Sequence, residues 1–412
     1  MLSVNQAQKK ILANIKVLAT TKTPLLECLN QVLARNIVST INVPLRNNSS
    51  MDGYAIKASD TKNANKKKIT LHVIGENQAG RIFKKEIKSG QAVRIMTGSV
   101  IPKGANAVVP FEDTDEYAKK NKSNNLPKQV QIYKTVQANE NIRKAAEDTK
   151  KGAMILKKNT LLNPAHIGLA ASVGIEKLPI TRKPIIAIIS SGNEIIRPPQ
   201  KIKPGQVYDS NTYSIASQVK QLGGVPKIYN IARDTIKNIQ IKLDHASKDS
   251  DLIISTAGVS KGDYDLFKEV VTLNGKIDFW SIKMKPGKPL MFGMIRQNNK
   301  QIPHIGLPGN PVSAMVTFEL FARPAILKMM NKNFKNRESI QAILNSDIIN
   351  SDKREVYARV QLSSRNNQIF ATITGNQGSG ILQSMSLADG LVKCPATKKT
   401  LKKGSLVQVI TL

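Results

Sequence analysis

The sequence predicts a multi-domain α/β protein whose central part is a doubly wound parallel sheet. Between residues 181 and 330, continuous apolar runs typical of buried strands alternate with amphipathic helical stretches, the pattern of strand–helix–strand units. Shorter strand-like runs, separated by Gly, Pro and Asn, occur before and after this part. The 412 residues are enough for roughly two to four domains of about 150 residues each.

The first 180 residues combine helical and strand-like patterns. Residues 1–20 are expected to form an amphipathic helix, because apolar residues recur on one helical face at Ile11, Ile15 and Leu18. Residues 40–180 carry β-type runs, the polar stretch 115–128 is expected to be an exposed hairpin loop, and helical periodicity returns over 153–175. The expected strands are Ile69–Val73, Ala92–Met96, Ala107–Val109 and Gln129–Ile132.

Residues 181–330 carry the doubly wound pattern. The first helix of this part is expected to have Asn211 as its N-cap and to end at Gly223, and a second helix is expected from Ile236 to Ala246. The expected strands are the runs Pro184–Ile189, Lys227–Ile231 and Asp251–Ser255.

Residues 335–412 return to short strands, and a small all-β domain is expected there. Turns are expected at Asn366-Asn367, at Ala388–Gly390 and at Lys403-Gly404.

Charge and composition disfavour several classes of protein. Lys and Arg number 62 against 29 Asp and Glu, which gives a formal net charge of +33. A nucleic-acid binder is nevertheless disfavoured, because aromatic residues make up only 4% and the lysines are scattered along the chain. The excess charge is interpreted as compositional drift, or as a field that attracts anionic substrates.

Cysteine usage and hydropathy indicate a reduced, cytoplasmic protein. Cys28 and Cys394 cannot form a disulfide framework, and no CxxC pair accompanies the four histidines, so a structural zinc site is not expected. No apolar run approaches the roughly 20 residues that cross a bilayer, and the first 21 residues lack the apolar core of a signal peptide. No membrane partner is expected.

Three strand ends of the predicted sheet are rich in glycine and polar residues. They are Ser190–Glu194, Ser255–Asp265 and Gly306–Ser313. Any one of them could be an ordinary connection, but the carboxyl ends of parallel strands share one edge, where ligands bind. Carboxylates at such an edge suit Mg²⁺ and phosphate oxygens, and Pro311 in a first helical turn suits an anion.

Other candidate segments are weaker when they are judged from their residues alone. The turn Lys285–Pro289 has two lysines that can meet an oxyanion, although a solvated basic turn is the simpler interpretation. Asp52, Thr97 and Asp148 each lie in or near a polar turn, where capping chemistry explains such residues equally well.

Taken as an ordered set, these segments resemble the molybdopterin molybdenumtransferase family, which includes MoeA and the gephyrin E domain. The matching stretches span nearly the whole chain. The combination of LPGNPVS, MKPGKP and GVSKGDYD at these spacings is highly specific. The matching stretches are MDGYA from Met51, MTGSVIPKGANAVV from Met96, NIRKAAEDTKKG from Asn141, SSGNEI from Ser190, GQVYDSN from Gly205, AGVSKGDYD from Ala257, MKPGKP from Met284, LPGNPVSA from Leu307 and GNQGSG from Gly375.

The resemblance implies an architecture and an assembly. Residues 1–180 would form an N-terminal helical region with a β domain inserted at about 55–140, and 181–330 would be the doubly wound domain that binds molybdopterin and adenylate. Residues 335–412 would form a β-barrel-like C-terminal domain. Members of the family form elongated homodimers. Their active site lies between one subunit's doubly wound domain and the partner's N-terminal and C-terminal regions.

The resemblance also implies a reaction. Enzymes of this family take adenylylated molybdopterin and molybdate, insert molybdenum at the dithiolene and release AMP, with Mg²⁺ required. A molybdopterin adenylyltransferase and the molybdenum enzymes that receive the product are the implied partners.

The site residues implied by the resemblance fall into three groups. Catalytic acids would be Asp52, Asp148, Glu194, Asp234 and Asp265, and Glu194 and Asp265 would also hold Mg²⁺. The substrate-binding residues would be Thr97, Ser190, Gly192, Gly258, Ser260, Lys285, Lys288, Pro308, Gly309, Asn310, Ser313, Arg359 and Ser379. Lys283 joins them as a candidate because of its position in the chain and not because of the resemblance.

The chain departs from the family pattern at four positions: Ala146 and Ala257 replace glycines, Asn193 replaces an acid and Ser281 replaces a cation. An added Cβ at 146 or 257 is expected to narrow a contact with the ligand. Because residues 281, 283 and 285 would share one face of a strand, Lys283 is a candidate replacement for the missing cation, although it is equally well explained as a solvated lysine. A catalytically weakened scaffold and a molybdopterin adenylyltransferase remain alternatives to the transferase.

Overall fold

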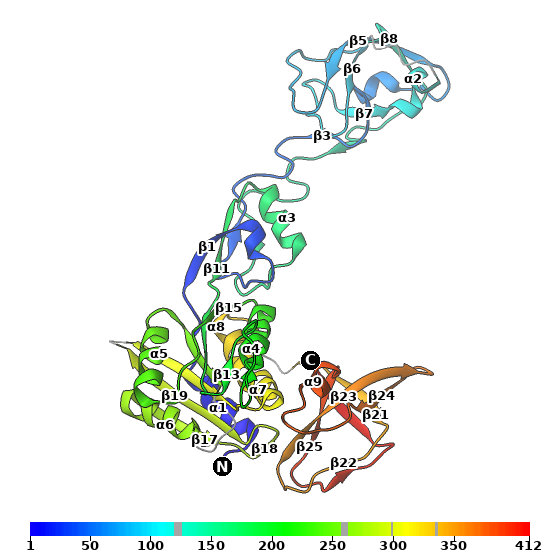
Figure 1. Ribbon diagram of the computed structural model, residues 1–412. Coiled ribbons are helices and arrows are strands. Elements are labelled where there is room, and N and C mark those ends of the chain that lie inside the picture. Colours follow the sequence, from blue (N-terminus) through cyan, green and yellow to red (C-terminus); the bar gives the residue numbers. More distant parts are fainter. Residues whose placement is uncertain (119–125, 257–262, 298–299, 334–336) are drawn as a thin grey trace. The chain divides into compact units, whose positions relative to one another are not determined.

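The computed structural model describes residues 1–118, 126–256, 263–297, 300–333 and 337–412. The chain divides into two compact units, whose elements are labelled in Figure 1. The first unit comprises Met1–Lys22, Asn30–Val32 and Pro179–Leu412, and the second comprises Thr23–Leu29 and Leu33–Leu178.

The first unit is built on a six-stranded sheet. In spatial order its strands are β15 (Val225–Ile228), β12 (Ile185–Ser190), β16 (Leu252–Thr256), β20 (Lys300–Leu307), β19 (Pro289–Gln297) and β17 (Gly275–Ser281). The first four are parallel, whereas β19 runs antiparallel to both of its neighbours. The expected doubly wound sheet is therefore confirmed, but it is mixed rather than wholly parallel. The reason is that too few residues separate β19 from β20 for a crossover connection.

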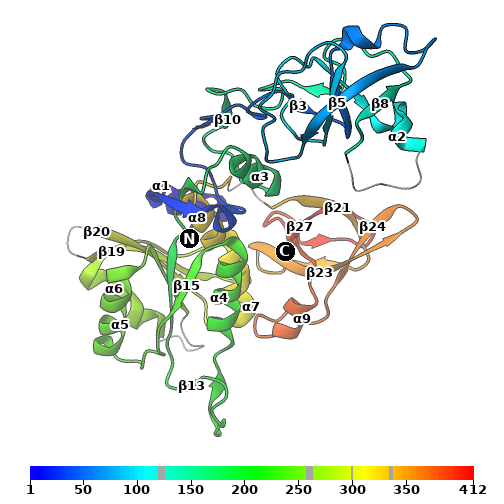
Figure 2. The same ribbon diagram turned by 90° about the horizontal axis from the view of Figure 1, so that it is seen from above.

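Helices cover both faces of this sheet, as Figures 1 and 2 show. Ile186 and Ile188 of β12 belong to one core, and Ala187 and Ile189 belong to the other, so both faces of the strand are buried. This explains why the strand is continuously apolar. The first core includes residues of α1 (Val4–Asn14), α4 (Ser210–Leu222), α7 (Pro311–Thr317) and α8 (Arg323–Met329), and the second includes residues of α5 (Ile236–Asp249) and α6 (Asp263–Asn274).

The ends of α4 are set by two residues. Asp209, not the expected Asn211, is the N-cap, and its carboxylate accepts the Thr212 N–H at 3.0 Å. The expected end at Gly223 is confirmed, because that residue adopts a left-handed conformation with φ of 91°.

The C-terminal part of the first unit contains a closed barrel, which confirms the expected β-barrel-like domain. Its strands β23 (Glu355–Arg365), β24 (Gln368–Ile373), β21 (Ser339–Leu344), β27 (Leu406–Thr411) and β25 (Gly390–Cys394) close because β25 also pairs with β23. The expected hairpin turn is present, with φ of 50° at Asn366 and 58° at Asn367. The barrel region also carries β22 (Ile348–Ile349) paired with β26 (Thr400–Leu401), and the helix α9 (Leu382–Ser386).

A short strand joins the barrel to the segment that follows β17. This strand, β18 (Met284–Lys285), pairs in parallel with the start of β23. The Lys285–Pro289 turn is therefore held against the C-terminal barrel.

The second unit contains a five-stranded sheet that confirms the four strands expected over residues 69–132. Its order is β7 (Ala107–Pro110), β4 (Gly53–Ile56), β6 (Gln91–Ile95), β5 (Ile69–Asn77) and β8 (Gln129–Ile132). The expected hairpin loop over 115–128 instead begins as a short helix, α2 (Asp115–Ala118), and residues 119–125 lie outside the described residues. The helix expected over 153–175 is α3 (Pro164–Ser172), preceded by the strand β10 (Met154–Leu156).

Short elements complete the two units. The paired strands are β1 (Thr20–Pro24) with β11 (Lys177–Thr181), β2 (Ile37–Val38) with β10, β3 (Asn48–Ser49) with β9 (Ile142–Arg143), and β13 (Ile195–Ile196) with β14 (Val207–Tyr208). The remaining helical turns are η1 (Leu25–Cys28), η2 (Ala58–Thr61), η3 (Phe111–Asp113) and η4 (Phe318–Ala322). Across the described residues, no helix combines the length and apolar character that a membrane span requires.

Candidate active site

Five strands of the first unit point their carboxyl ends toward one edge of the sheet. β15, β12, β16 and β20 are parallel, and β17 shares their direction because both it and β20 run antiparallel to β19. The segments that follow these strands carry most of the predicted site residues of this unit. Ligands bind at this kind of edge in open α/β sheets.

The segment after β12 begins with a buried serine. Ser190 is only 1% exposed, and its Oγ donates to Asp209 Oδ2 at 2.8 Å. The same carboxylate oxygen accepts the Thr212 hydroxyl at 2.7 Å. Ser190 therefore anchors the start of α4, and it does not present its hydroxyl at the surface.

Gly192 shapes the backbone beside Glu194. Its φ is 146°, and a Cβ at this position would lie 2.8 Å from both Glu194 Oε2 and Ile195 Cδ1. Only glycine fits there without displacing a neighbour. Gly192 thus leaves room for the half-buried Glu194 side chain next to its own backbone.

Asn193 and Asp234 form a reciprocal pair that joins the segments following β12 and β15. The Asn193 N–H donates to Asp234 Oδ2 at 3.0 Å, and the Asp234 N–H donates to Asn193 Oδ1 at 3.4 Å. An aspartate at 193 could accept the same N–H. The departure at Asn193 therefore keeps the backbone contact and removes one negative charge from the neighbourhood of Glu194.

The segment after β20 is tied to the C-terminal barrel region. Asn310 Nδ2 donates to Ser379 Oγ at 3.0 Å, and the Val312 N–H donates to the Ser379 carbonyl at 3.1 Å. The Asn211 amide also donates to the carbonyl of Gly309 at 2.7 Å. Two predicted residues, Asn310 and Ser379, are brought together, and part of the helix N-terminus expected to face an anion is satisfied by Ser379. Pro308 and Ser313 of the same segment are buried.

Arg359 supports the Ser379 segment from inside the protein. Its side chain is fully buried, and it donates to Ser384 Oγ at 2.8 Å and to the carbonyls of Asn376 and Gly378 at 3.2 Å each. Burial lowers the pKa of this guanidinium below its ordinary value. In this structure the Arg359 side chain therefore contacts the protein interior, and its expected contact with the substrate stays a prediction.

Three exposed lysines follow β17: Lys283, Lys285 and Lys288. Ile282 and Met284, the two neighbours of Lys283 in the chain, are buried, so the expected alternation of faces is confirmed. The single strand expected over 281–285 is wrong, because β17 ends at Ser281 and β18 pairs with the barrel.

Lys285 has an acidic partner that the sequence did not suggest. Its Nζ lies 3.2 Å from Asp352 Oδ2, and Arg354 pairs with the same carboxylate oxygen. The Arg354 guanidinium, followed by the Lys285 ammonium, lowers the pKa of Asp352 to about 2. Sixty-odd residues of sequence separate the partners, and only the β18–β23 pairing brings them together.

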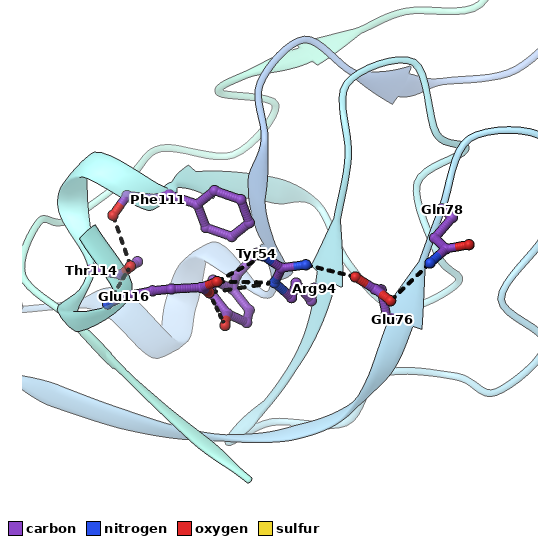
Figure 3. A network of polar contacts seen from close by, with 7 residues as sticks. All are labelled: Tyr54, Glu76, Gln78, Arg94, Phe111, Thr114 and Glu116. Atoms are coloured by element: carbon purple, nitrogen blue, oxygen red, sulfur yellow. Dashed lines mark hydrogen bonds and ion pairs between the residues drawn. The ribbon is translucent and has the colours of Figure 1, made fainter. Parts of the chain in front are cut away.

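In the second unit, Asp52 and Thr97 are in direct contact. Asp52 Oδ1 accepts the Thr97 N–H at 2.7 Å and the Thr97 hydroxyl at 2.8 Å. These two hydrogen bonds, with a smaller contribution from the charge of Arg94, lower the pKa of Asp52 below its usual value. Arg94 itself belongs to a network of polar contacts with Tyr54, Glu76 and Glu116 (Figure 3).

Asp148 is exposed, and the turn before it is strained. Its N–H donates to the carbonyl of Val43 at 3.0 Å, which fixes the backbone but leaves the carboxylate exposed. Ala146 adopts a φ of 65°, in the left-handed region where glycine is favoured. The departure at Ala146 thus places a side chain on a backbone conformation that disfavours one.

The loop after β16 lies largely outside the described residues, and this includes Gly258, Ser260 and the departure Ala257. Asp265 belongs to the first turn of α6. Among the residues the structure describes, no group of three or more His, Cys, Asp or Glu side chains forms a metal site.

Family models cover almost the whole chain. Residues 2–174 match the MoeA N-terminal region (domain I and II), residues 187–328 match a probable molybdopterin binding domain, and residues 341–412 match the MoeA C-terminal region (domain IV).

Individual relatives match along their full length. The chain is 31% identical to the molybdopterin molybdenumtransferase of Haemophilus influenzae, over 99% of this chain and 98% of the relative. It is 33% identical to the molybdopterin molybdenumtransferase of Nostoc sp., over 93% of this chain and 86% of the relative. A crystal structure of a molybdopterin biosynthesis MoeA protein from Pyrococcus horikoshii is similar over 100% of this chain and 99% of that chain, with a TM-score of 0.83 and 30% identity.

Proposed function

We propose a specific reaction for this chain. The chain belongs to the molybdopterin molybdenumtransferase family of transferases, and it therefore acts in molybdenum cofactor biosynthesis. The substrates are adenylylated molybdopterin and molybdate. Molybdenum is inserted at the dithiolene, and AMP is released.

The observation that supports this proposal is the shared edge of the first unit's sheet. The acids Glu194 and Asp234 follow two of the strands that end there, and the lysines of the Lys285 turn follow a third. Carboxylates can hold a metal ion next to the phosphoanhydride of the adenylate. Cations and hydroxyl groups can bind a tetrahedral oxyanion such as molybdate. Both kinds of group are available at one edge.

The adenylate side is proposed to need Mg²⁺, with Glu194 and Asp265 as its protein ligands. Mg²⁺ usually takes one or two carboxylates together with substrate phosphates, so a pair of acids without a third fits this ion. When bound, the ion would neutralise charge on the phosphoanhydride. The Asn193–Asp234 pair would hold the backbone next to Glu194 in place.

The molybdate side is proposed to use Lys285, Lys288 and Ser379. Lys285 and Lys288 are exposed, and Ser379 is held next to Asn310. We further propose that the chain acts as a cytoplasmic homodimer, that Asp52, Thr97 and Asp148 serve the same reaction, and that it exchanges intermediates with an adenylyltransferase and with molybdenum enzymes.

An assay of AMP release tests this function. Purified chain is incubated with adenylylated molybdopterin, molybdate and Mg²⁺, and AMP is measured with each component omitted in turn. The proposal expects AMP only in the complete mixture, and loss of AMP when a chelator removes Mg²⁺. Release of pyrophosphate from ATP and molybdopterin would identify an adenylyltransferase instead. Absence of AMP from a folded chain would favour a scaffold.

A further inference from the structure

The geometry of the second unit points to Arg94 as a positioning residue for Asp52 and Thr97. The inference rests on the proposed function only in that Asp52 and Thr97 are taken to serve the reaction. Arg94 does not contact the carboxylate of Asp52 through any hydrogen bond that the structure describes. Arg94 acts instead through the strands β4 and β6, the ring of Phe111 and the carboxylates of Glu76 and Glu116 (Figure 3).

The strand pairing places Arg94 directly behind the Asp52–Thr97 contact. In the antiparallel pair of β4 and β6, Tyr54 lies opposite Arg94 and Gly53 lies opposite Ile95. Asp52 immediately precedes β4, and Thr97 follows β6 at the same end of the pair. The position of Thr97 therefore depends on how firmly this end of β6 is held.

Two carboxylates fix the guanidinium of Arg94. One nitrogen lies 2.7 Å from Glu76 Oε1 on β5, and another lies 2.7 Å from Glu116 Oε1 on α2. The planar fork of arginine can pair with both at once, which the point charge of a lysine cannot do in the same geometry. β6 is thereby attached to the neighbouring strand and to α2.

The hydroxyl of Tyr54 completes the network. It donates to the second oxygen of Glu116 at 2.5 Å, and the Tyr54 side chain is fully buried. Burial, with the adjacent Glu116 carboxylate, raises the pKa of Tyr54 above its ordinary value, so the phenol remains a hydrogen-bond donor. Glu116 thus joins Arg94 on β6 to Tyr54 on β4, the two strands that lead to Thr97 and Asp52.

A second route runs through Phe111. The Arg94 guanidinium carbon lies 4.8 Å from the centre of the Phe111 ring, and the Phe111 N–H donates to the carbonyl of Asp52 at 3.1 Å. Arg94 therefore constrains Asp52 twice: at its backbone through Phe111, and at its carboxylate through Thr97.

A purely structural role predicts different behaviour from a positioning role. The side chains of Arg94, Glu76 and Glu116 are 24%, 28% and 27% exposed, and ion pairs of this kind contribute only modestly to stability. The largest influences on the pKa of Asp52 are its hydrogen bonds from Thr97, so loosening β6 should move that pKa even if the protein stays folded.

The test compares Arg94→Met and Arg94→Lys with the matched control Arg81→Met, which removes the same charge from an exposed position of the same sheet domain. The Asp52 carboxyl is titrated by NMR, and kcat and KM are measured in the AMP-release assay. Arg94→Met removes both the direct effect of the Arg94 charge on Asp52 and the hold on β6, so the pKa of Asp52 is expected to rise toward the usual aspartate value. In the same variant kcat is expected to fall by about tenfold or more with little change in KM. Arg94→Lys keeps the charge but not the contact with both carboxylates, so an Asp52 pKa that stays above the wild-type value there, with kcat only partly recovered, reports the loss of positioning. Arg81→Met should match the wild type.

An Asp52 pKa and a kcat that are both unchanged in folded Arg94→Met would overturn the inference. If Arg94→Met does not fold, Arg94→Lys decides, because wild-type values of both quantities in that variant would also overturn it. The titration does not depend on catalysis. A wild-type chain that releases no AMP would therefore refute the proposed function, while the Asp52 titration would still test whether Arg94 positions that carboxyl.

Discussion

Lys285 and Asp352 form an ion pair where the segment after β17 meets the C-terminal barrel, with 3.2 Å between Nζ and Oδ2. Arg354 binds the same oxygen of Asp352. The Asp352 carboxylate thus pairs with two cations, so it still has Arg354 as a partner when Lys285 moves away. The pair places the ammonium next to the barrel while keeping it available to an oxyanion.

Replacing Asp352 with asparagine is expected to lower the KM for molybdate by up to about fivefold. The carboxylate competes with an oxyanion for Lys285, and exposed ion pairs of this kind contribute at most about 1 kcal/mol. The measurement is AMP release as a function of molybdate concentration. Asp347→Asn is the matched control, since Asp347 pairs with Lys402 instead. An increased KM in Asp352→Asn would show that the pair orients Lys285 for binding and does not compete with it.

Ala146→Gly is expected to stabilise the protein by about 0.5–1 kcal/mol. The left-handed conformation of Ala146 costs about 1–2 kcal/mol for a residue with a Cβ, and part of the gain is offset by the greater freedom of glycine in the unfolded chain. Thermal unfolding of the two proteins measures the difference. Asn63→Gly is the control, because Asn63 has a φ of 70° but asparagine tolerates that region well. Equal shifts in both variants would contradict the explanation.

Arg359→Met and Ser379→Ala are expected to distinguish a residue that stabilises the fold from a residue that binds molybdate. Arg359→Met removes the donor to the buried Ser384 hydroxyl and to the carbonyls of Asn376 and Gly378, which should destabilise the protein by about 2–3 kcal/mol. Ser379→Ala should change stability by less than about 1 kcal/mol but raise the KM for molybdate. Unfolding curves and molybdate titrations supply both quantities. A stability loss in Ser379→Ala as large as in Arg359→Met would refute this division of roles.

Lys283 is expected to replace the cation that the family carries at position 281. Its backbone is held on both sides, since its N–H donates to Leu2 and its carbonyl accepts from Glu355. Lys283→Ala should raise the KM for molybdate, and adding Ser281→Lys to it should restore the wild-type value. Lys276→Ala, at the opposite end of β17, is the control. A molybdate KM that stays constant in Lys283→Ala would leave Lys283 as a solvated lysine.

Local patterns were enough to predict the doubly wound sheet and a small all-β domain at the C-terminal end, whereas the barrel-like form of that domain was implied by the family resemblance. The continuous apolar run of β12 and the turn at Asn366-Asn367 both depend on residues that are neighbours in the sequence. The antiparallel direction of β19 was not predicted, because an apolar run has no direction and the decisive feature was the short connection to β20. The capping by Asp209 was missed because Asn211, two residues further along the chain, is an equally good N-cap by type.

The candidate site was predictable only as a set of residues, and most of its contacts were not. Asn310 meets Ser379, and Lys285 meets Asp352, across 60 or more residues of sequence. The second contact depends on the pairing of β18 with β23, which no local pattern indicates. The burial of Arg359 was likewise invisible, since an arginine on a strand is exposed more often than not. The family motifs indicated the candidate residues, whereas only the three-dimensional structure distinguishes candidates that are exposed from candidates that are buried and contact other protein groups.

The most direct test of the central claim is the molybdenum content of the pterin produced. Adenylylated molybdopterin, molybdate and Mg²⁺ are incubated with the wild-type chain and with Asp234→Asn, and the molybdenum bound in the isolated pterin fraction is determined by elemental analysis. The account predicts molybdenum in the pterin at a level that tracks AMP release for the wild-type chain, and a strong reduction of both for Asp234→Asn. A pterin fraction free of molybdenum after incubation with folded wild-type chain would contradict the assignment of this chain as a molybdenumtransferase.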